Sequence, residues 1–173
     1  MAIHSSLKRA LAGALMVLAM PIPGLALAQA GLDVSLSARR VAVDVKGRET
    51  FQPATEAKPG QVVEYRAAYR NPGSTSVREV KATLPIPQGT EYVANTARPA
   101  PALASLDGRT FEAVPLVRKV KLSNGQTVVR EVPVSEYRYL RWSLGAITAG
   151  RTESVSARVR VSPLVAAASP SGR

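Results

Sequence analysis

The sequence of 173 residues contains no cysteine and a single histidine, His4. Without cysteine the chain cannot form a disulfide, use thiolate chemistry or hold zinc through sulfur. If the segment that carries His4 is removed, as argued below, Ser-His-Asp and Cys-His catalysis are excluded as well. Aromatic residues make up only 5% of the chain, and it shows almost no helical periodicity. We therefore expect no enzyme, no catalytic residue, no metal and no cofactor.

Carboxylate chemistry is the alternative that these absences leave open. Glu131 and Glu136 are the candidate pair for glycoside hydrolysis, which needs two converging acids. Both have basic neighbours, Arg130 and Arg138, so surface ion pairing is the better explanation. The aspartates show no D-x-D-x-D-G spacing, and no calcium loop is expected.

The first thirty residues have the three parts of a cleavable secretory signal. A basic start closes with Lys8 and Arg9, residues 10–20 form an uninterrupted apolar run, and Ala26-Leu27-Ala28 gives a small-residue cleavage pattern. The run is too short to span a bilayer, which takes about 20 residues. We predict a Sec-type signal peptide over residues 1–28, with cleavage after residue 28 or 30. The mature protein is then extracytoplasmic, either periplasmic or secreted.

The charge is strongly positive, with 23 lysines and arginines against 12 acids. Loss of Lys8 and Arg9 with the signal leaves 21 basic and 12 acidic side chains, a net charge of +9. A basic exported protein attracts anionic partners such as lipid headgroups, acidic glycans or wall polymers. Nucleic acid is not expected outside the cytoplasm. The alternative is a solvated basic surface without a specific partner, and the candidate partner is an unidentified protein or an anionic envelope polymer.

Alternation of apolar and polar residues predicts strands along the mature chain. The clearest early case is Val62–Arg70, which stops at the turn signal Asn71-Pro72-Gly73. The stretch around Trp142 alternates likewise and is expected to end at Gly145, while the polar residues 46–58 are expected to form a loop. Further strands are predicted over residues 32–38, 41–45, 77–84 and 154–161.

A hairpin is predicted over residues 117–134. Two β-rich runs, 117–122 and 127–134, flank Ser123-Asn124-Gly125-Gln126, and Asn-Gly between such runs is a strong hairpin signal. The phase is imperfect because Arg118 falls in register with apolar residues. Either a bulge or an edge position would explain this.

Several short strands at turn-marked intervals favour an all-β sandwich over residues 31–163. This length suits a single domain, which commonly holds about 100–150 residues. Residues 164–173 are rich in alanine, serine and proline and are expected to form a flexible tail. No transmembrane helix is expected in the mature chain.

Short motifs follow one another in a recognisable order: Lys58-Pro59-Gly60-Gln61-Val62-Val63-Glu64-Tyr65, Arg70-Asn71-Pro72-Gly73, Leu84-Pro85, Pro87-Gln88-Gly89-Thr90-Glu91-Tyr92-Val93, Trp142-Ser143-Leu144-Gly145 and Ala149-Gly150. This order resembles domain-of-unknown-function family number eleven, the conserved repeat domain of bacterial and archaeal surface proteins. The resemblance implies an immunoglobulin-like β-sandwich of about seven to nine antiparallel strands, without assigned catalysis. Its fold-signature residues are Gly60, Tyr65, Asn71, Gly73, Leu84, Pro85, Gly89, Trp142, Gly145 and Gly150. The chain departs from the family in its single copy and in Ala82, where an acid is usual.

One cluster is a candidate interaction face. It combines the basic residues of the predicted hairpin with two aromatic residues that follow it: Arg118, Lys119, Lys121, Arg130, Tyr137 and Tyr139. A cationic hairpin suits an acidic glycan, a lipid headgroup or an acidic protein. The alternative is an edge whose charges only block unwanted strand pairing.

These features predict an exported, non-enzymatic structural or interaction module of the cell envelope. The first alternative is an anion-binding protein that acts through the basic hairpin, and the second is an envelope hydrolase with a carboxylate pair.

Overall fold

A computed structural model describes residues 31–163, so the predicted signal peptide and tail lie outside the described residues. This part of the chain folds into eleven β-strands and one short 3₁₀ helix, η1 (Val134–Glu136). Every strand pairing is antiparallel, which confirms the predicted all-β fold. The strands outnumber the expected seven to nine because three of them are pieces of only two or three residues.

The larger sheet has five strands and is built around β3 (Val62–Arg70). The strand order is β2 (Glu49–Pro53), β1 (Asp33–Val43), β3, β11 (Thr152–Val161) and β5 (Thr90–Tyr92). In β3, Val63, Ala67 and Tyr69 are buried, whereas Arg66 and Arg70 on the other face are exposed. The period of two therefore gives this sheet one apolar and one polar face.

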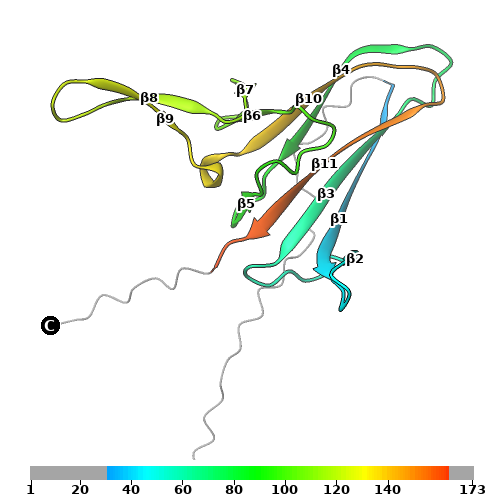
Figure 1. Ribbon diagram of the computed structural model, residues 1–173. Helices are drawn as coiled ribbons and strands as arrows, with labels where there is room; N and C mark the ends of the chain where they lie inside the picture. The colour runs from blue at the N-terminus through cyan, green and yellow to red at the C-terminus, as the bar shows by residue number, and fades with distance from the viewer. Residues whose placement is uncertain (1–30, 164–173) are drawn as a thin grey trace, which may run out of the picture.

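The smaller sheet has four strands in the order β4 (Val77–Pro85), β10 (Tyr139–Ile147), β6 (Leu103–Ser105) and β7 (Glu112–Ala113). It lies against the apolar face of the five-stranded sheet, so the two form a sandwich-like pair of layers (Figure 1). In β4 and β10, every second side chain points into the space between the layers.

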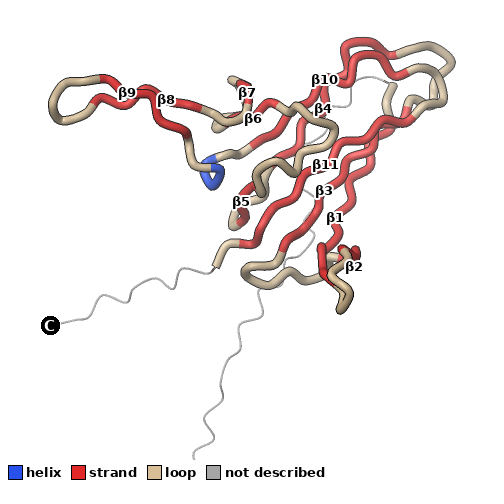
Figure 2. The backbone as a smooth tube through the Cα atoms, viewed as in Figure 1, coloured by secondary structure: helices blue, strands red, loops and turns tan. Residues whose placement is uncertain are grey.

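The remaining two strands, β8 (Val117–Lys121) and β9 (Thr127–Glu131), form a separate two-stranded sheet. Within residues 31–163 they pair with each other and with no other strand. We call residues 117–131 the ribbon, and Figure 2 shows it projecting away from both larger sheets.

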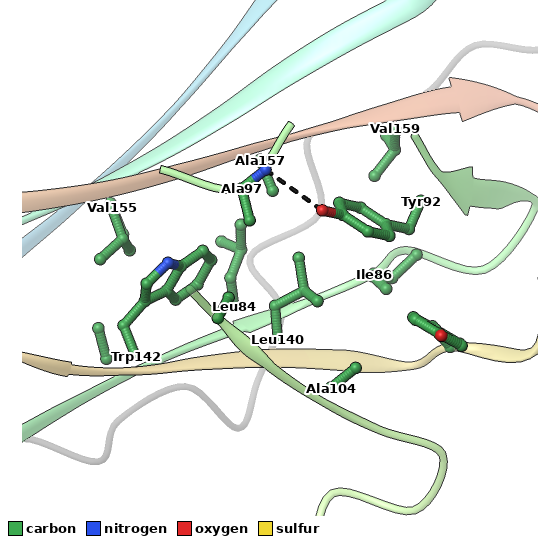
Figure 3. Packing of buried hydrophobic residues seen from close by; sticks show 14 of the residues in the cluster. Leu84, Ile86, Tyr92, Ala97, Ala104, Leu140, Trp142, Val155, Ala157 and Val159 are labelled. Atoms are coloured by element: carbon green, nitrogen blue, oxygen red, sulfur yellow. Dashed lines mark hydrogen bonds between the residues drawn. The ribbon is translucent and has the colours of Figure 1, made fainter. Parts of the chain in front are cut away.

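Trp142 lies at the centre of the core, with 2% of its surface exposed, as the sequence predicted (Figure 3). It packs beside Leu140 of the same strand and faces Val155 and Ala157 of β11. Its indole Nε1 donates a hydrogen bond of 2.8 Å to the Pro99 carbonyl, which satisfies its one polar group. Burial of these apolar side chains is the main force that holds the layers together.

Three strand predictions were wrong in detail. β2 occupies residues predicted as a loop, because β1 supplies a five-residue pairing partner that the polar sequence does not reveal. β1 is continuous, where two separate strands were expected. β10 continues past Gly145 to Ile147. Register shifts in its pairing with β4 accommodate Gly145, which has a positive φ of 69°.

The fold-signature residues occupy turns and core positions. Gly60, Gly89 and Gly150 have positive φ in the turns beside β3, β5 and β11. Leu84 and Trp142 are buried, while Pro85 and Tyr65 are half-buried. Asn71 is 1% exposed, and its side-chain oxygen accepts a hydrogen bond from the Gly73 N–H.

Candidate interaction surface

The ribbon turns through a three-residue loop. The Gly125 N–H donates to the Leu122 carbonyl at 3.0 Å, and the Leu122 N–H donates to the Gln126 carbonyl at 2.8 Å. Gly125 has a φ of 81°, whereas Asn124 does not adopt a positive φ. This is a three-residue hairpin loop with glycine in the left-handed position, and not the two-residue turn that Asn-Gly often forms. The Asn124 side chain accepts a hydrogen bond from the Gln126 N–H, which further fixes the tip.

The register of the ribbon divides the predicted basic residues between two faces. Arg118 lies opposite Arg130, on the same face as the half-buried Val120. Lys119 and Lys121 lie on the other face. The pairing between β8 and β9 is regular and contains no bulge. The edge position of the strand therefore explains why Arg118 falls on the same face as the apolar residue Val120. The ribbon is therefore basic on both sides, and the single cationic face that the sequence suggested does not form.

Arg118 differs from the other three cations because its charge is already paired. Its two terminal nitrogens donate to the two carboxylate oxygens of Glu136 at 2.8 and 3.0 Å. This two-bond geometry holds the ribbon against η1. Lys119, Lys121 and Arg130 are exposed and form no ion pair within the described residues. They are the cations of the ribbon that remain available to a partner.

Tyr137 does not belong to the interaction face, and its assignment there was wrong. Its side chain is completely buried, and its ring stacks on that of Tyr92 with a centroid distance of 6.2 Å. Its hydroxyl accepts a hydrogen bond of 2.8 Å from the Leu116 N–H at the base of the ribbon. The turn of η1 directs this side chain into the core, where it supports the ribbon from below.

Tyr139 lies on the outer side of the four-stranded sheet and is half-buried. Its ring covers Gly108, where an added Cβ would come within 2.9 Å of the tyrosine Cε2. Its main contact is therefore with a turn of the same domain, and the structure does not bring it together with the ribbon lysines.

The proposed carboxylate pair is not assembled as a catalytic site. Both oxygens of Glu136 are engaged by Arg118, whereas Glu131 stands at the end of β9 beside a hollow of about 410 Å³ that is mostly apolar. Within residues 31–163, no group of three or more acidic side chains is arranged to hold a metal ion. The same residues contain no helix long and apolar enough to cross a bilayer.

Comparison of the chain with models of protein families, with curated proteins and with solved structures found no significant match. The resemblance to the conserved repeat domain therefore stays a prediction that rests on the motifs of the sequence.

Proposed function

We propose that this chain is an exported, non-enzymatic interaction module of the cell envelope, built on an immunoglobulin-like β-sandwich. The observation that carries the proposal is the ribbon, which projects from the sandwich and pairs with no other strand of the described chain. A two-stranded hairpin is only marginally stable by itself in water. This ribbon is held at its base by Tyr137 and by the Arg118–Glu136 pair. A supported, projecting ribbon suits contact with another molecule.

The chemistry of the ribbon favours an anionic partner. Lys119, Lys121 and Arg130 are exposed and unpaired in residues 31–163, and they place positive charge on both faces. Val117 and Val129 lie on the same face as Lys119 and Lys121. They are 50% and 63% exposed, respectively, and add apolar contact area. An acidic glycan or an anionic lipid surface at the envelope would meet both features. The predicted signal peptide supports this location.

Shortening the ribbon tests the proposal. In one variant, residues 119–129 are replaced by Asn-Gly, so that Arg118 still pairs with Glu136. In a second variant, Lys119, Lys121 and Arg130 are replaced by glutamine. We expect both variants to keep the thermal midpoint of the wild type and to lose co-sedimentation with isolated cell envelopes. Binding of the wild type should weaken with salt, because exposed charges are screened over about 8 Å at physiological ionic strength.

A matched control removes the same charge elsewhere. Lys46, Lys58 and Arg151 are exposed and form no ion pair in residues 31–163, and their replacement by glutamine should leave envelope binding intact. If the shortened variant sediments with envelopes as well as the wild type does, the ribbon is not the interaction surface. If the glutamine variant binds while the shortened variant does not, shape and apolar contact carry the interaction and the anionic partner is wrong.

A further inference from the structure

The outer face of the four-stranded sheet carries a second basic region, which lies apart from the ribbon in the chain. It is a shallow hollow of about 310 Å³ over β4, β10 and β6. The residues that line it are Lys81, Leu103, Arg109, Phe111, Arg141, Trp142 and Ser143. Because Leu140 and Trp142 of β10 point into the core, the alternate residues Arg141 and Ser143 point outward into this hollow.

Three cations line this hollow, and no carboxylate does. Lys81 and Arg109 are exposed and form no ion pair in the part of the chain that the structure describes. On the five-stranded sheet, by contrast, Arg39 and Arg158 are both paired with Glu64, at 2.8 and 3.6 Å. The hollow therefore gathers positive charge that the protein itself does not neutralise, and an anion placed there would relieve the repulsion.

Arg141 is already oriented toward such an anion. Its guanidinium carbon lies 3.4 Å from the centre of the Phe111 ring, and its Nε donates a hydrogen bond of 3.0 Å to the Thr83 hydroxyl. These two contacts fix the plane of the guanidinium at its inner side. Within residues 31–163 its two terminal nitrogens form no hydrogen bond or ion pair, and they are the donors that bind a carboxylate or phosphate through two parallel bonds.

Arg109 is positioned by a tightly bonded turn. One oxygen of Asp107 accepts hydrogen bonds from the N–H groups of Arg109 at 2.8 Å and Thr110 at 3.0 Å. These bonds hold the pKa of Asp107 below its ordinary value of 3.8. Ser105 fastens the other side of the turn, because its hydroxyl accepts a hydrogen bond of 2.9 Å from the Gly108 N–H. The Arg109 side chain therefore extends from an ordered backbone. Less conformational entropy is then lost when Arg109 binds a ligand.

The hollow also has an apolar wall. Leu103 is 40% exposed, and Phe111 is half-buried beside it. A sugar ring with an acidic substituent offers both an oxyanion and a row of C–H groups, so it matches cations set beside an apolar wall. We propose that this hollow binds an acidic sugar unit of a polysaccharide, with Arg141 and Arg109 on the oxyanion and Leu103 and Phe111 against the ring.

The experiment measures the binding of a short oligogalacturonate to the purified mature protein by two-dimensional NMR. We expect the backbone amide signals of Arg141 and Ser143 to shift on titration, whereas the indole signal of Trp142, which lies in the core, should stay unchanged. The double change Lys81→Gln and Arg109→Gln should weaken binding by about tenfold or more, since charge-assisted bonds are among the stronger polar contacts. Arg141→Lys keeps the charge but loses the planar fork, and it should weaken binding by roughly threefold or more.

A control variant separates this site from general charge, and the signals of the hollow separate it from the ribbon. The glutamine variant of Lys46, Lys58 and Arg151 should bind oligogalacturonate as the wild type does, and the amide signals of the hollow should shift equally in the glutamine variant of Lys119, Lys121 and Arg130. The proposal is overturned if either variant weakens the shifts at the hollow as much as the double variant. It is also overturned if oligogalacturonate shifts no signal around the hollow, or if neutral dextran competes equally. Neither result decides the function proposed for the ribbon, whose test uses envelope binding and the shortened variant.

Discussion

Asn71 shows how much of this fold depends on a single polar side chain. Its amide nitrogen donates hydrogen bonds of 2.8 Å to the carbonyls of Thr75 and Ile147, and its oxygen accepts one from the Gly73 N–H. Ile147 lies 76 residues further along the chain. Asn71 therefore joins the turn after β3 to the end of β10, and it connects the two layers of the sandwich at one end.

Replacing Asn71 by alanine leaves these backbone groups without their partner. A buried polar group without a hydrogen-bond partner costs about 1–3 kcal/mol. We therefore expect the free energy of unfolding in urea to fall by about 1–3 kcal/mol or more. Asn71→Asp should destabilise similarly, because a carboxylate cannot donate to two carbonyls. Asn124→Ala is the matched control. Asn124 is exposed at the ribbon tip, and its loss should change stability by about 0.5 kcal/mol or less. Equal effects at the two positions would contradict the connecting role of Asn71.

At the scale of single elements, β2 is attached to the sheet by more than its pairing with β1. Both terminal nitrogens of Arg158 in β11 donate to Glu49 of β2 at 2.7 Å. Arg158 also meets Glu64, which pairs with Arg39 of β1. A chain of alternating charges thus runs over the outer face of the five-stranded sheet and fixes its edge strand.

This contact makes the edge of the sheet sensitive to acid. The hydrogen bond from Arg158 holds the pKa of Glu49 below its ordinary value of 4.5. A carboxylate whose pKa is lower in the folded protein stabilises it fully above the unfolded value, and this contribution is lost as the pH falls through the folded value. We expect the thermal midpoint to fall between about pH 7 and about pH 3, and to fall less in Glu49→Gln. Glu153→Gln, which changes a carboxylate without an ion pair in residues 31–163, should keep the full fall. The role of the pair is wrong if both variants respond alike.

The sequence predicted the elements whose pattern is local. β3 has the predicted bounds, and the buried position of Trp142 follows from its alternation with Leu140. β2 could not be predicted, because its polar residues become a strand only when β1 and Arg158 are in place. Tyr137 could not be placed either, since the turn of η1 that directs it inward leaves no periodic signal.

The candidate surfaces were predictable only in part. The hairpin and its basic content follow from Asn124-Gly125 and the flanking β-rich runs. Register decides which cations share a face, and the pairing of Arg118 with Glu136 depends on how the ribbon meets η1. The hollow was missed entirely, because Lys81, Arg109 and Arg141 stand far apart in the sequence. Only the pairing of β4, β10 and β6 brings such positions together.

At the scale of the whole molecule, the first prediction concerns export. Protein recovered from an extracytoplasmic fraction should begin near Gln29 or Gly31, because the basic start, apolar run and Ala26-Leu27-Ala28 pattern direct cleavage there. Intact-mass spectrometry measures this directly. Replacing Ala26 and Ala28 by bulky residues should block cleavage and leave a heavier, membrane-associated precursor. Recovery of the uncleaved wild-type chain in the cytoplasm would contradict the prediction.

The direction of the two long strands that flank β3 has a mechanical consequence. β1 and β11 both run antiparallel to β3, and each is joined to it by nine register pairs. The chain enters the sheet at Asp33, level with Thr152, and leaves it past Val161 at the opposite end. Tension applied between these two points pulls β1 and β11 lengthwise against β3, so the ladder bonds, which lie across the strands, are loaded together in shear. Forced unfolding is governed by the rate of the first rupture, and a strand pair loaded in this way must lose many bonds at once before it yields.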